Sequence, residues 1–387
     1  MRIALVFRNF GPYHLARLRA LRKRNDVLAL EFVEKDPDYS WDHKGASDSI
    51  YSLGNSDTPL NLRRQRMQSV LKDFDPDCVA VPGWVEPLAL HTALAAHRYK
   101  WPAILMSDSR REDAPRNILT ERVKARLLNL FSAALVAGNA HQRYLTKLGF
   151  PESRIVKGYD VVDNAFFMAN ANEPLAPLSV GNQKLPRNFF FCCGRLIEKK
   201  NIEFLLRAYC RFKLKIGAPP WHLVVAGDGK LKRALQQAIV ALDLVGNVHL
   251  LGDVPYEKLP ALYGLARAFV FPSITDQWGL VVNEAMAAGL PVLVSRGAGA
   301  AELVEEGKNG YTFDPYNLNE LATLLLRMAN SENLADMGRA SREIIAGWGL
   351  ERFSRELITA AQIAAQAGGP EPSMADLMLA QVVAAIP

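Results

Sequence analysis

The chain has 387 residues, of which 49% are hydrophobic and 22% are charged, and its formal net charge is +6. Because single hydrophobic cores stop growing at about 250–300 residues, this length predicts two domains. Lys and Arg residues are scattered along the chain, which argues against a nucleic-acid-binding protein, in which basic residues gather with aromatic ones. No apolar run reaches the ~18 residues that a transmembrane helix needs.

The four cysteines and the N-terminal residues indicate the cellular compartment in which the protein is expected. None of the cysteines has CxxC spacing, so we expect reduced thiols in a cytoplasmic protein. The first 14 residues, MRIALVFRNFGPYH, contain an apolar run too short for a signal peptide and instead predict a strand. The stretch RLRALRKR at 17–24 favours a solvated helix face, although peripheral contact with the inner face of a membrane stays open.

Short β-branched runs alternate with helical patterns along the whole chain. In the first half, strands are expected at 3–7, 27–32, 78–81, 103–106, 134–137 and 155–156, and helices at 13–23, 60–74 and 87–97. In the second half, strands are expected at 189–193, 222–226, 248–251, 268–271, 291–294 and 310–313, and helices at 202–214, 230–242 and 318–328. Strands without polar alternation, separated by helices, indicate parallel sheets covered on both faces.

The segment 164–188, rich in Asn, Ala and Pro, separates the two series. We therefore predict an α/β protein of two Rossmann-like, doubly wound domains that face each other across a cleft. The predicted boundaries are 1–165 for the N-terminal domain, 166–187 for the linker and 188–355 for the C-terminal domain. The C-terminal helices 356–387 are assigned to the N-terminal domain, although the pattern of 351–366 alone fits either domain.

The stretch ITDQWGLVVNEAMAAGLPVLVS begins at residue 274 and places two carboxylates eight residues apart. Asp276 lies just before a helix that begins near Leu280, where free backbone N–H groups attract anions. Glu284 lies two turns deeper, among apolar and small residues that predict burial, and a buried carboxylate needs partners. A ligand that carries hydroxyl and phosphate groups could contact both acids, whereas the structural alternative is a helix with an acidic start and one solvated Glu.

Two further strand ends in the second half carry Gly or basic residues. In FFFCCGRLIEKKN, Gly194 ends a strand, Arg195 follows it, and Lys200 stands at the start of the next helix. This pair suits a diphosphate, because Arg binds paired oxygens and Lys supplies a mobile charge; a solvated basic loop is the alternative.

In VVAGDGKLKRAL, Gly227 begins a tight turn, and Asp228 is expected to cap a helix that starts at Lys230. This turn lacks a full GxGxxG fingerprint, so its structural interpretation is favoured.

Two loops of the first half are candidates for the sugar or acceptor side. Gly11 allows a close backbone approach, and His14 either hydrogen-bonds a ligand or caps its helix. Asp108 and Ser109, in the polar loop MSDSRREDAPR, could contact sugar hydroxyls, although a wet surface loop is slightly favoured for each of them. No HExxH, Walker A or GxSxG motif and no metal-spaced His/Cys cluster occurs, so we expect no metal and no cofactor.

Taken together and in this order, these segments resemble glycosyltransferase family 4, the retaining enzymes of GT-B fold that use nucleoside-diphosphate sugars. The resemblance rests on GRLIEKKN, AGDGKLKRAL, NVHLLGDVPYEKLPALYGLARAFVFPS, DQWGLVVNEAMAAGLPVLVS and GAAELVEEGKNGYTFDP. It covers residues 189–313 well and the N-terminal half only loosely. It implies a hexosyltransferase that moves a sugar from a nucleotide sugar, UDP first, to an acceptor hydroxyl in polysaccharide, glycolipid or glycoconjugate synthesis.

The resemblance also implies roles for individual residues. Glu284 would hold the ribose, Arg195 and Lys200 would neutralise the diphosphate, and Asp276, with the backbone near Trp278 and Gly279, would contact the donor sugar. The family usually has Glu at the position of Asp276, and it commonly has a His in a loop that here reads MSDSRREDAPR. A non-catalytic nucleotide-sugar binding protein and an NAD-dependent oxidoreductase are the alternative functions.

Overall fold

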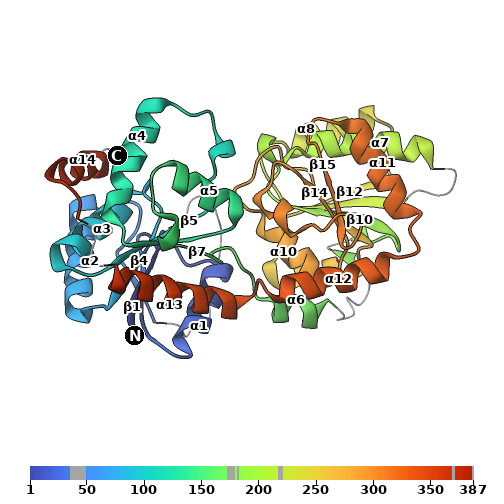
Figure 1. The fold of residues 1–387 in the computed structure, drawn as a ribbon. Coiled ribbons are helices and arrows are strands. Elements are labelled where there is room, and N and C mark those ends of the chain that lie inside the picture. Colours follow the sequence, from blue (N-terminus) through green and yellow to red (C-terminus); the bar gives the residue numbers. More distant parts are fainter. Residues whose placement is uncertain (35–48, 172–178, 181–182, 217–220, 368–370, 386–387) are drawn as a thin grey trace. The chain divides into compact units, whose positions relative to one another are not determined.

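The computed structural model describes residues 1–34, 49–171, 179–180, 183–216, 221–367 and 371–385 (Figure 1). The chain divides into two compact units. Unit 1 comprises Met1–Val161 and Leu350–Pro387, and unit 2 comprises Val162–Gly349. Among the described residues, no helix is long and apolar enough to cross a membrane.

Unit 1 is built on a parallel seven-stranded sheet in the order β3-β2-β1-β4-β5-β6-β7. The strands are β1 (Arg2–Phe7), β2 (Asp26–Glu31), β3 (Ile50–Ser52), β4 (Cys78–Pro82), β5 (Ala103–Ser107), β6 (Ala133–Val136) and β7 (Ile155–Lys157). The helices are α1 (Pro12–Arg22), α2 (Leu60–Phe74), α3 (Pro87–Tyr99), α4 (Ile118–Leu127), α5 (Asn139–Lys147), α13 (Leu350–Gln366) and α14 (Met374–Ala384).

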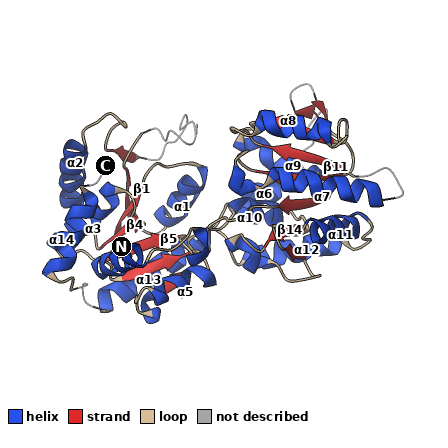
Figure 2. Ribbon diagram, turned by 90° about the horizontal axis from the view of Figure 1, so that it is seen from above, coloured by secondary structure: helices blue, strands red, loops and turns tan. Residues whose placement is uncertain are grey.

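The period-2 alternation of the strands sorts the core of unit 1 into two layers. Ile3, Leu5 and Phe7 of β1 pack in one layer with α1 and α13, whereas Ala4 and Val6 pack in the other layer with α2, α3 and α14. Figure 2 shows helices on both sides of the strands. This covering explains why the strands read as continuous apolar runs in the sequence.

Unit 2 contains a parallel six-stranded sheet in the order β12-β11-β10-β13-β14-β15. The strands are β10 (Phe189–Cys193), β11 (His222–Ala226), β12 (Val248–Gly252), β13 (Ala268–Phe271), β14 (Val292–Ser295) and β15 (Gly310–Phe313). The helices are α6 (Asn164–Asn170), α7 (Ile202–Lys215), α8 (Lys232–Ala241), α9 (Leu259–Leu265), α10 (Leu280–Ala287), α11 (Leu318–Ala329) and α12 (Leu334–Ala346). A small antiparallel pair, β8 (Ser179–Val180) and β9 (Gln183–Lys184), precedes the sheet.

The two sheets share one topology. When the strands are counted within each sheet, both sheets contain the order 3-2-1-4-5-6 of a doubly wound Rossmann sheet, so the expected fold class is confirmed. The strand order reverses between β1 and β4 in unit 1 and between β10 and β13 in unit 2. Ligands of open α/β sheets bind beyond the carboxyl ends of the strands at this switch point. In unit 2, the two loops to inspect are therefore those that follow β10 and β13.

The boundaries of the units differ from the predicted ones. Part of the predicted linker 166–187 is helix α6, which packs against α9 and α10 in unit 2. Asp163 caps this helix by accepting a hydrogen bond from the backbone N–H of Phe166, at 3.0 Å. Residues 172–178 and 181–182 lie outside the described part of the chain.

At the other end of unit 2, the predicted boundary at residue 355 falls inside α13. This helix packs as a whole on α1, β6 and β7 of unit 1. It buries Phe353, Leu357 and Ala360 in the core of that unit. The return to unit 1 therefore begins at Leu350, earlier than the sequence pattern indicated.

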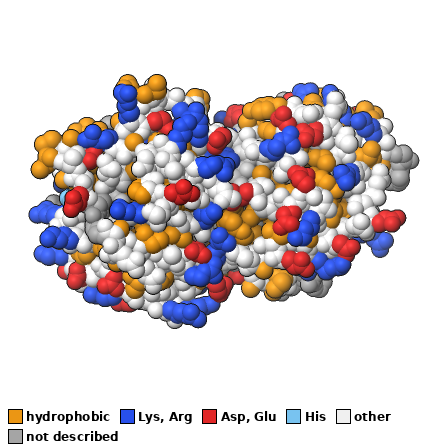
Figure 3. All heavy atoms as spheres, viewed as in Figure 1, with side chains coloured by type: hydrophobic (Ala, Val, Ile, Leu, Met, Phe, Trp, Pro, Cys, Tyr) orange, Lys and Arg blue, Asp and Glu red, His pale blue; other side chains and the backbone are white. Residues whose placement is uncertain are grey.

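Charged side chains do not form one large patch of a single sign on the face shown in Figure 3, where Lys and Arg are interspersed with Asp and Glu over both units. All four cysteines are free thiols. Burial raises the pKa of the Cys192 thiol to about 12, so this side chain behaves as a small apolar group of the core.

Candidate active site

The loop after β10 begins with Gly194 and carries both basic candidates. Lys200 belongs to a 3₁₀ turn, Glu198–Lys200, directly before α7. The backbone N–H of Gly194 donates to the carbonyl of Ala226, at 3.0 Å, and that of Leu196 donates to the carbonyl of Asp228, at 2.8 Å. The loops after β10 and β11 therefore hold each other, and Arg195, which is partly exposed, lies between these two hydrogen bonds in the chain.

This contact requires glycine at position 227. Gly227 has a φ of +132°, and a Cβ atom built there would lie 2.1 Å from the carbonyl oxygen of Gly194. No larger residue fits without moving one of the loops. The carboxylate of Asp228 accepts from the N–H of Gly229, at 2.7 Å, and pairs with Lys232, which lowers the pKa of Asp228. The expected cap is therefore wrong: α8 begins at Lys232, and Asp228 stabilises the turn before it.

The loop after β13 joins the loop after β10. The N–H of Ile274 donates to the carbonyl of Lys199, at 2.8 Å, and the ammonium group of Lys200 forms an ion pair with the carboxylate of Asp276. Both charged side chains are largely buried, with 15% and 11% of their surface exposed, and the Lys200 ammonium lies 5.0 Å from the centre of the Phe271 ring. The structure therefore places two of the three predicted catalytic residues in direct contact.

Residues 276–279 are held by the loop that follows β14. The N–H groups of Gly299 and Ala300 donate to the carbonyls of Asp276 and Trp278, at 3.0 and 2.9 Å. The Trp278 side chain is buried and its indole N–H donates to Asn283, at 2.9 Å. The ring N–H and the backbone carbonyl of Trp278 are thus both engaged within unit 2.

Helix α10 begins after Gly279, which has a φ of +104°, a conformation that favours glycine. Among the described residues, the N–H groups of Gly279, Leu280 and Val281 have no acceptor. The buried hydroxyl groups of Ser273 and Thr275 likewise lack a hydrogen-bond partner in the described part of the chain. Because buried polar groups are normally paired, this cluster is a candidate contact for a polar ligand.

The carboxylate of Glu284 lies inside unit 2, with none of its surface exposed. Its Oε2 atom accepts a hydrogen bond from the Tyr263 hydroxyl, at 2.7 Å. The Tyr263 ring is surrounded by Phe167, Phe191 and Phe269, with ring centres 5.1 to 5.9 Å away. The predicted burial of Glu284 is therefore confirmed, and Tyr263 is the partner that a buried carboxylate requires.

Tyr263 was missed by the sequence analysis. It lies in the stretch LPALYGLA of α9, which reads as an ordinary core helix, and nothing in that stretch indicates contact with a carboxylate 21 residues away. Asn283, which fixes Trp278, was missed for the same reason. The hydroxyls of Ser273 and Thr275 precede Asp276 directly, so a search for polar residues around that acid would have found them.

The candidates of unit 1 lie at two strand ends that are not neighbours in the sheet. Gly11 and His14 follow β1, whereas Asp108 and Ser109 follow β5, and β4 separates these strands. Nδ1 of His14 accepts from the N–H of Gly11, at 3.3 Å, and burial, aided by the charge of Arg17, lowers the pKa of His14 to about 3. His14 is thus a neutral helix cap, one of the two roles that the sequence left open.

The polar loop after β5 is held together internally. The N–H of Ser109 donates to the Ser107 hydroxyl, at 3.2 Å, and the buried Arg110 pairs with Asp113, at 3.0 Å. Asp108 and Ser109 are both partly exposed. Their proposed contact with sugar hydroxyls stays a prediction.

Nothing in the described part of the chain groups three or more His, Cys, Asp or Glu residues in a way that could hold a metal ion. The candidate site of unit 2 instead offers the cations of Arg195 and Lys200, backbone N–H groups and two acids. This combination suits a ligand with both phosphate and hydroxyl groups.

Comparison with known proteins agrees with this site. Residues 179–344 match the family model "Glycosyl transferases group 1", and this match confirms the resemblance seen in the sequence. An uncharacterized glycosyltransferase of Methanocaldococcus jannaschii is 30% identical over 193 residues, 49% of this chain and 48% of the relative. The GDP-mannose-dependent alpha-(1-6)-phosphatidylinositol monomannoside mannosyltransferase of Mycolicibacterium smegmatis is 30% identical over 171 residues, 42% of this chain and 43% of the relative. The matched region thus spans about half the length of these curated relatives.

A solved structure resembles the chain over nearly its whole length. Anabaena HepE in complex with UDP has a TM-score of 0.72 and 19% sequence identity, and the match covers 93% of this chain and 99% of that one. At this identity the likeness shows the fold, and it confirms the expected GT-B architecture.

Proposed function

We propose that this chain is a retaining glycosyltransferase that moves a hexose-type sugar from a nucleoside-diphosphate sugar to an acceptor hydroxyl. The proposal rests most on one observation: Lys200, Asp276 and the unpaired N–H groups at the start of α10 gather at the switch point of unit 2. A pyrophosphate needs cations and N–H donors, and a sugar needs a carboxylate that accepts from its hydroxyls. The family match of the same segment supports this interpretation.

In this proposal the chemistry is mainly electrostatic. Departure of the nucleoside diphosphate leaves negative charge on the phosphate and an oxocarbenium-like sugar. Arg195, Lys200 and the N–H groups of α10 would stabilise that charge, and one such contact is typically worth about 10²–10³ in rate. Two cations can neutralise the diphosphate without a metal ion, so we propose metal independence. Retention would follow if the acceptor attacked from the leaving-group face and the departing phosphate took its proton.

The ion pair between Lys200 and Asp276 adds a step to donor binding. A phosphate at Lys200 would have to share or replace the carboxylate as its partner, and Asp276 would turn to the sugar hydroxyls. The aspartate side chain is one methylene shorter than the glutamate usual in the family, so this exchange requires a close approach of the sugar. Glu284, held by Tyr263, would accept from the ribose hydroxyls after a small movement that exposes it.

The nucleotide base and the acceptor require a screen. The mycobacterial relative is named for GDP-mannose and a phosphatidylinositol mannoside, whereas the Anabaena structure contains UDP. We put UDP sugars first and propose a polysaccharide, glycolipid or small glycoconjugate as the acceptor.

The test is a panel of UDP, GDP and ADP sugars with the purified full chain, read by the nucleotide that is released. Slow donor hydrolysis with one nucleotide class, abolished in Arg195→Ala, would support the enzyme. Binding of a nucleotide sugar without any turnover, in the presence of an acceptor library, would indicate a binding protein instead. Thermal stabilisation by NAD and not by any nucleoside diphosphate would overturn the proposal.

A further inference from the structure

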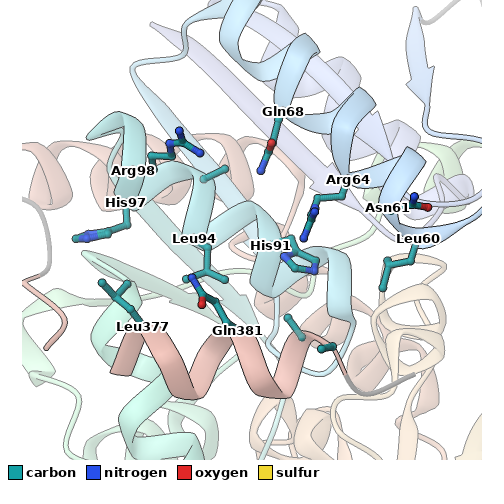
Figure 4. Close-up of a pocket in the computed structure, with 13 residues that line it drawn as sticks. Leu60, Asn61, Arg64, Gln68, His91, Leu94, His97, Arg98, Leu377 and Gln381 are labelled. Carbon is teal, nitrogen blue, oxygen red and sulfur yellow. The ribbon is translucent and has the colours of Figure 1, made fainter. Parts of the chain in front are cut away.

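A groove in unit 1 lies apart from every residue assigned above. It is a cavity of about 800 Å³ lined by α2, α3 and α14 (Figure 4). Helix α3 packs against both of the other two helices and forms the floor, while α2 and α14 form the walls. The volume lies within the range of small-molecule sites, about 300–1,000 Å³.

The walls present apolar and polar side chains at helical spacing. Leu60, Arg64 and Gln68 of α2 recur every four residues, and Leu377 and Gln381 of α14 do the same. Leu94 of α3 lies on the floor, and the small side chains of Ala95, Ala384 and Ala385 keep the groove open. The lining residues of α2 and of α14 therefore each form one stripe along their helix.

The charged residues that line the groove are all basic. They include Arg64 and Arg98, together with two histidines, and no Asp or Glu. Neither arginine makes an ion pair with any residue that the structure describes. Figure 4 shows the guanidinium group of Arg64 turned toward the ring of His91. Burial, aided by the charge of Arg64, lowers the pKa of His91, so this ring favours its neutral form.

We propose that this groove binds an amphipathic anion, with its phosphate or carboxylate group at Arg64 and its apolar body along Leu94 and Leu377. The guanidinium fork fits such oxygens bidentately, and neutral His91 can donate a further hydrogen bond. Leu60 of α2 lines the groove beyond Arg64 and His91 (Figure 4). This site is distinct from the donor site, because all of its residues belong to unit 1.

Two other occupants fit these features less well. A partner helix would place an apolar stripe against the groove and leave the arginines without anions, at the cost of desolvating unpaired charges. A flat membrane surface would reach the rim but not the concave floor formed by Leu94 and Ala95. A single molecule with one anionic group and an apolar body satisfies both the charge and the shape.

The test uses calorimetric titration of the full chain with monododecyl phosphate below its micelle concentration. We expect one molecule bound per chain, with affinity reduced about tenfold or more in Arg64→Gln, since a charge-assisted contact is lost. Gln381→Trp, a substitution at an exposed position that fills the groove, should also abolish binding. Lys72→Gln is the matched control, because Lys72 is exposed on the same helix outside the groove and its loss should change nothing.

Three further probes decide which features matter. Weaker binding of dodecanol and of inorganic phosphate would support a site that requires both the anion and the apolar body. Inorganic phosphate that binds as tightly as monododecyl phosphate would overturn the apolar part of the proposal. Affinity for monododecyl phosphate that stays unchanged from the parent chain in both Arg64→Gln and Gln381→Trp would place the ligand elsewhere. Binding to phosphatidylglycerol vesicles without binding to monomeric monododecyl phosphate would overturn the proposal and indicate a membrane-binding surface instead. Undiminished binding in the presence of saturating UDP would keep this groove separate from the donor site.

Discussion

The two units share one strand order but treat the polar groups at their strand ends differently. In unit 1, the N–H of Gly11 is bonded by His14, the N–H of Gly138 by His141 and Arg110 by Asp113. In unit 2, the described residues provide no acceptor for the first N–H groups of α10 and no partner for the hydroxyls of Ser273 and Thr275. The comparison teaches that the shared topology alone does not choose between the two edges, and that the unpaired groups after β13 and before α10 are what favour unit 2 as the candidate site.

The strongest way to break this comparison is to remove the cations from the edge of unit 2. Arg195→Ala and Lys200→Ala should each lower the rate of sugar transfer or donor hydrolysis about 10²–10³-fold, because each removes charge stabilisation of the leaving diphosphate. Lys199→Ala is the control. Lys199 contacts the site through its backbone carbonyl, which accepts from the N–H of Ile274, and the substitution leaves this carbonyl in place. A steady-state assay with unchanged rates in both variants would refute the proposed roles.

The glycines at the strand ends offer a matched pair of substitutions. Gly227→Ala should destabilise the protein by about 3 kcal/mol and abolish UDP binding, because its Cβ atom would strike the Gly194 carbonyl. Gly83→Ala, after β4 in unit 1, meets nothing within 4 Å and should cost only about 1 kcal/mol through its positive φ. Urea unfolding and UDP titration check both, and equal losses in the two variants would contradict the difference in packing.

Tyr263→Phe tests whether the hydrogen bond to Glu284 serves donor binding. The loss of a hydrogen bond to a charged acceptor should weaken UDP affinity about tenfold, with little change in fold. Tyr209→Phe removes a similar bond, to the carbonyl of Trp221 at 2.7 Å, elsewhere in unit 2. We expect Tyr209→Phe to lower the free energy of unfolding by about 1 kcal/mol and to leave the affinity for UDP unchanged. Equal UDP affinities in the two variants would exclude a positioning role for Tyr263.

His14 tests the comparison in unit 1. Of the substitutions considered, His14→Gln has the smallest expected effect at neutral pH. Its folded-state pKa of about 3 lies below the ordinary 6.5, so the unfolded chain takes up the proton first. Stability from the neutral ring is complete above about pH 6.5 and is lost as the pH falls toward 3. His14→Gln should make the acid loss of unfolding free energy shallower, by up to ~1.4 kcal/mol per pH unit. Urea unfolding at several pH values checks this, and parallel curves would exclude the cap.

The sequence predicted the sheets and the local motifs better than it predicted partners. Apolar runs such as FFFCC reflect burial on both sheet faces, so the positions of the strands could be predicted from the sequence. Glu284 could be predicted to be buried from its neighbours, but Tyr263 could not be predicted as its partner, because their contact depends on how α9 and α10 pack. The predicted cap at Asp228 was wrong because one oxygen of this carboxylate binds the N–H of Gly229 and the other binds Lys232, and the helix begins only at Lys232.

The return of the chain through α13 has a practical consequence for cutting the molecule into fragments. Unit 2 is one uninterrupted segment, and its two ends adjoin, because the Asn164 side chain donates to the carbonyl of Ile345 at 2.8 Å. Unit 2 can therefore be excised with a single pair of cuts, at Val162 and Gly349. Unit 1 cannot be obtained by simple truncation, since stopping at Gly349 would strip Phe353, Leu357 and Ala360 from its interior and uncover the part of the sheet face that α13 covers beside α1. A short bridge from Val161 to Leu350 would restore it.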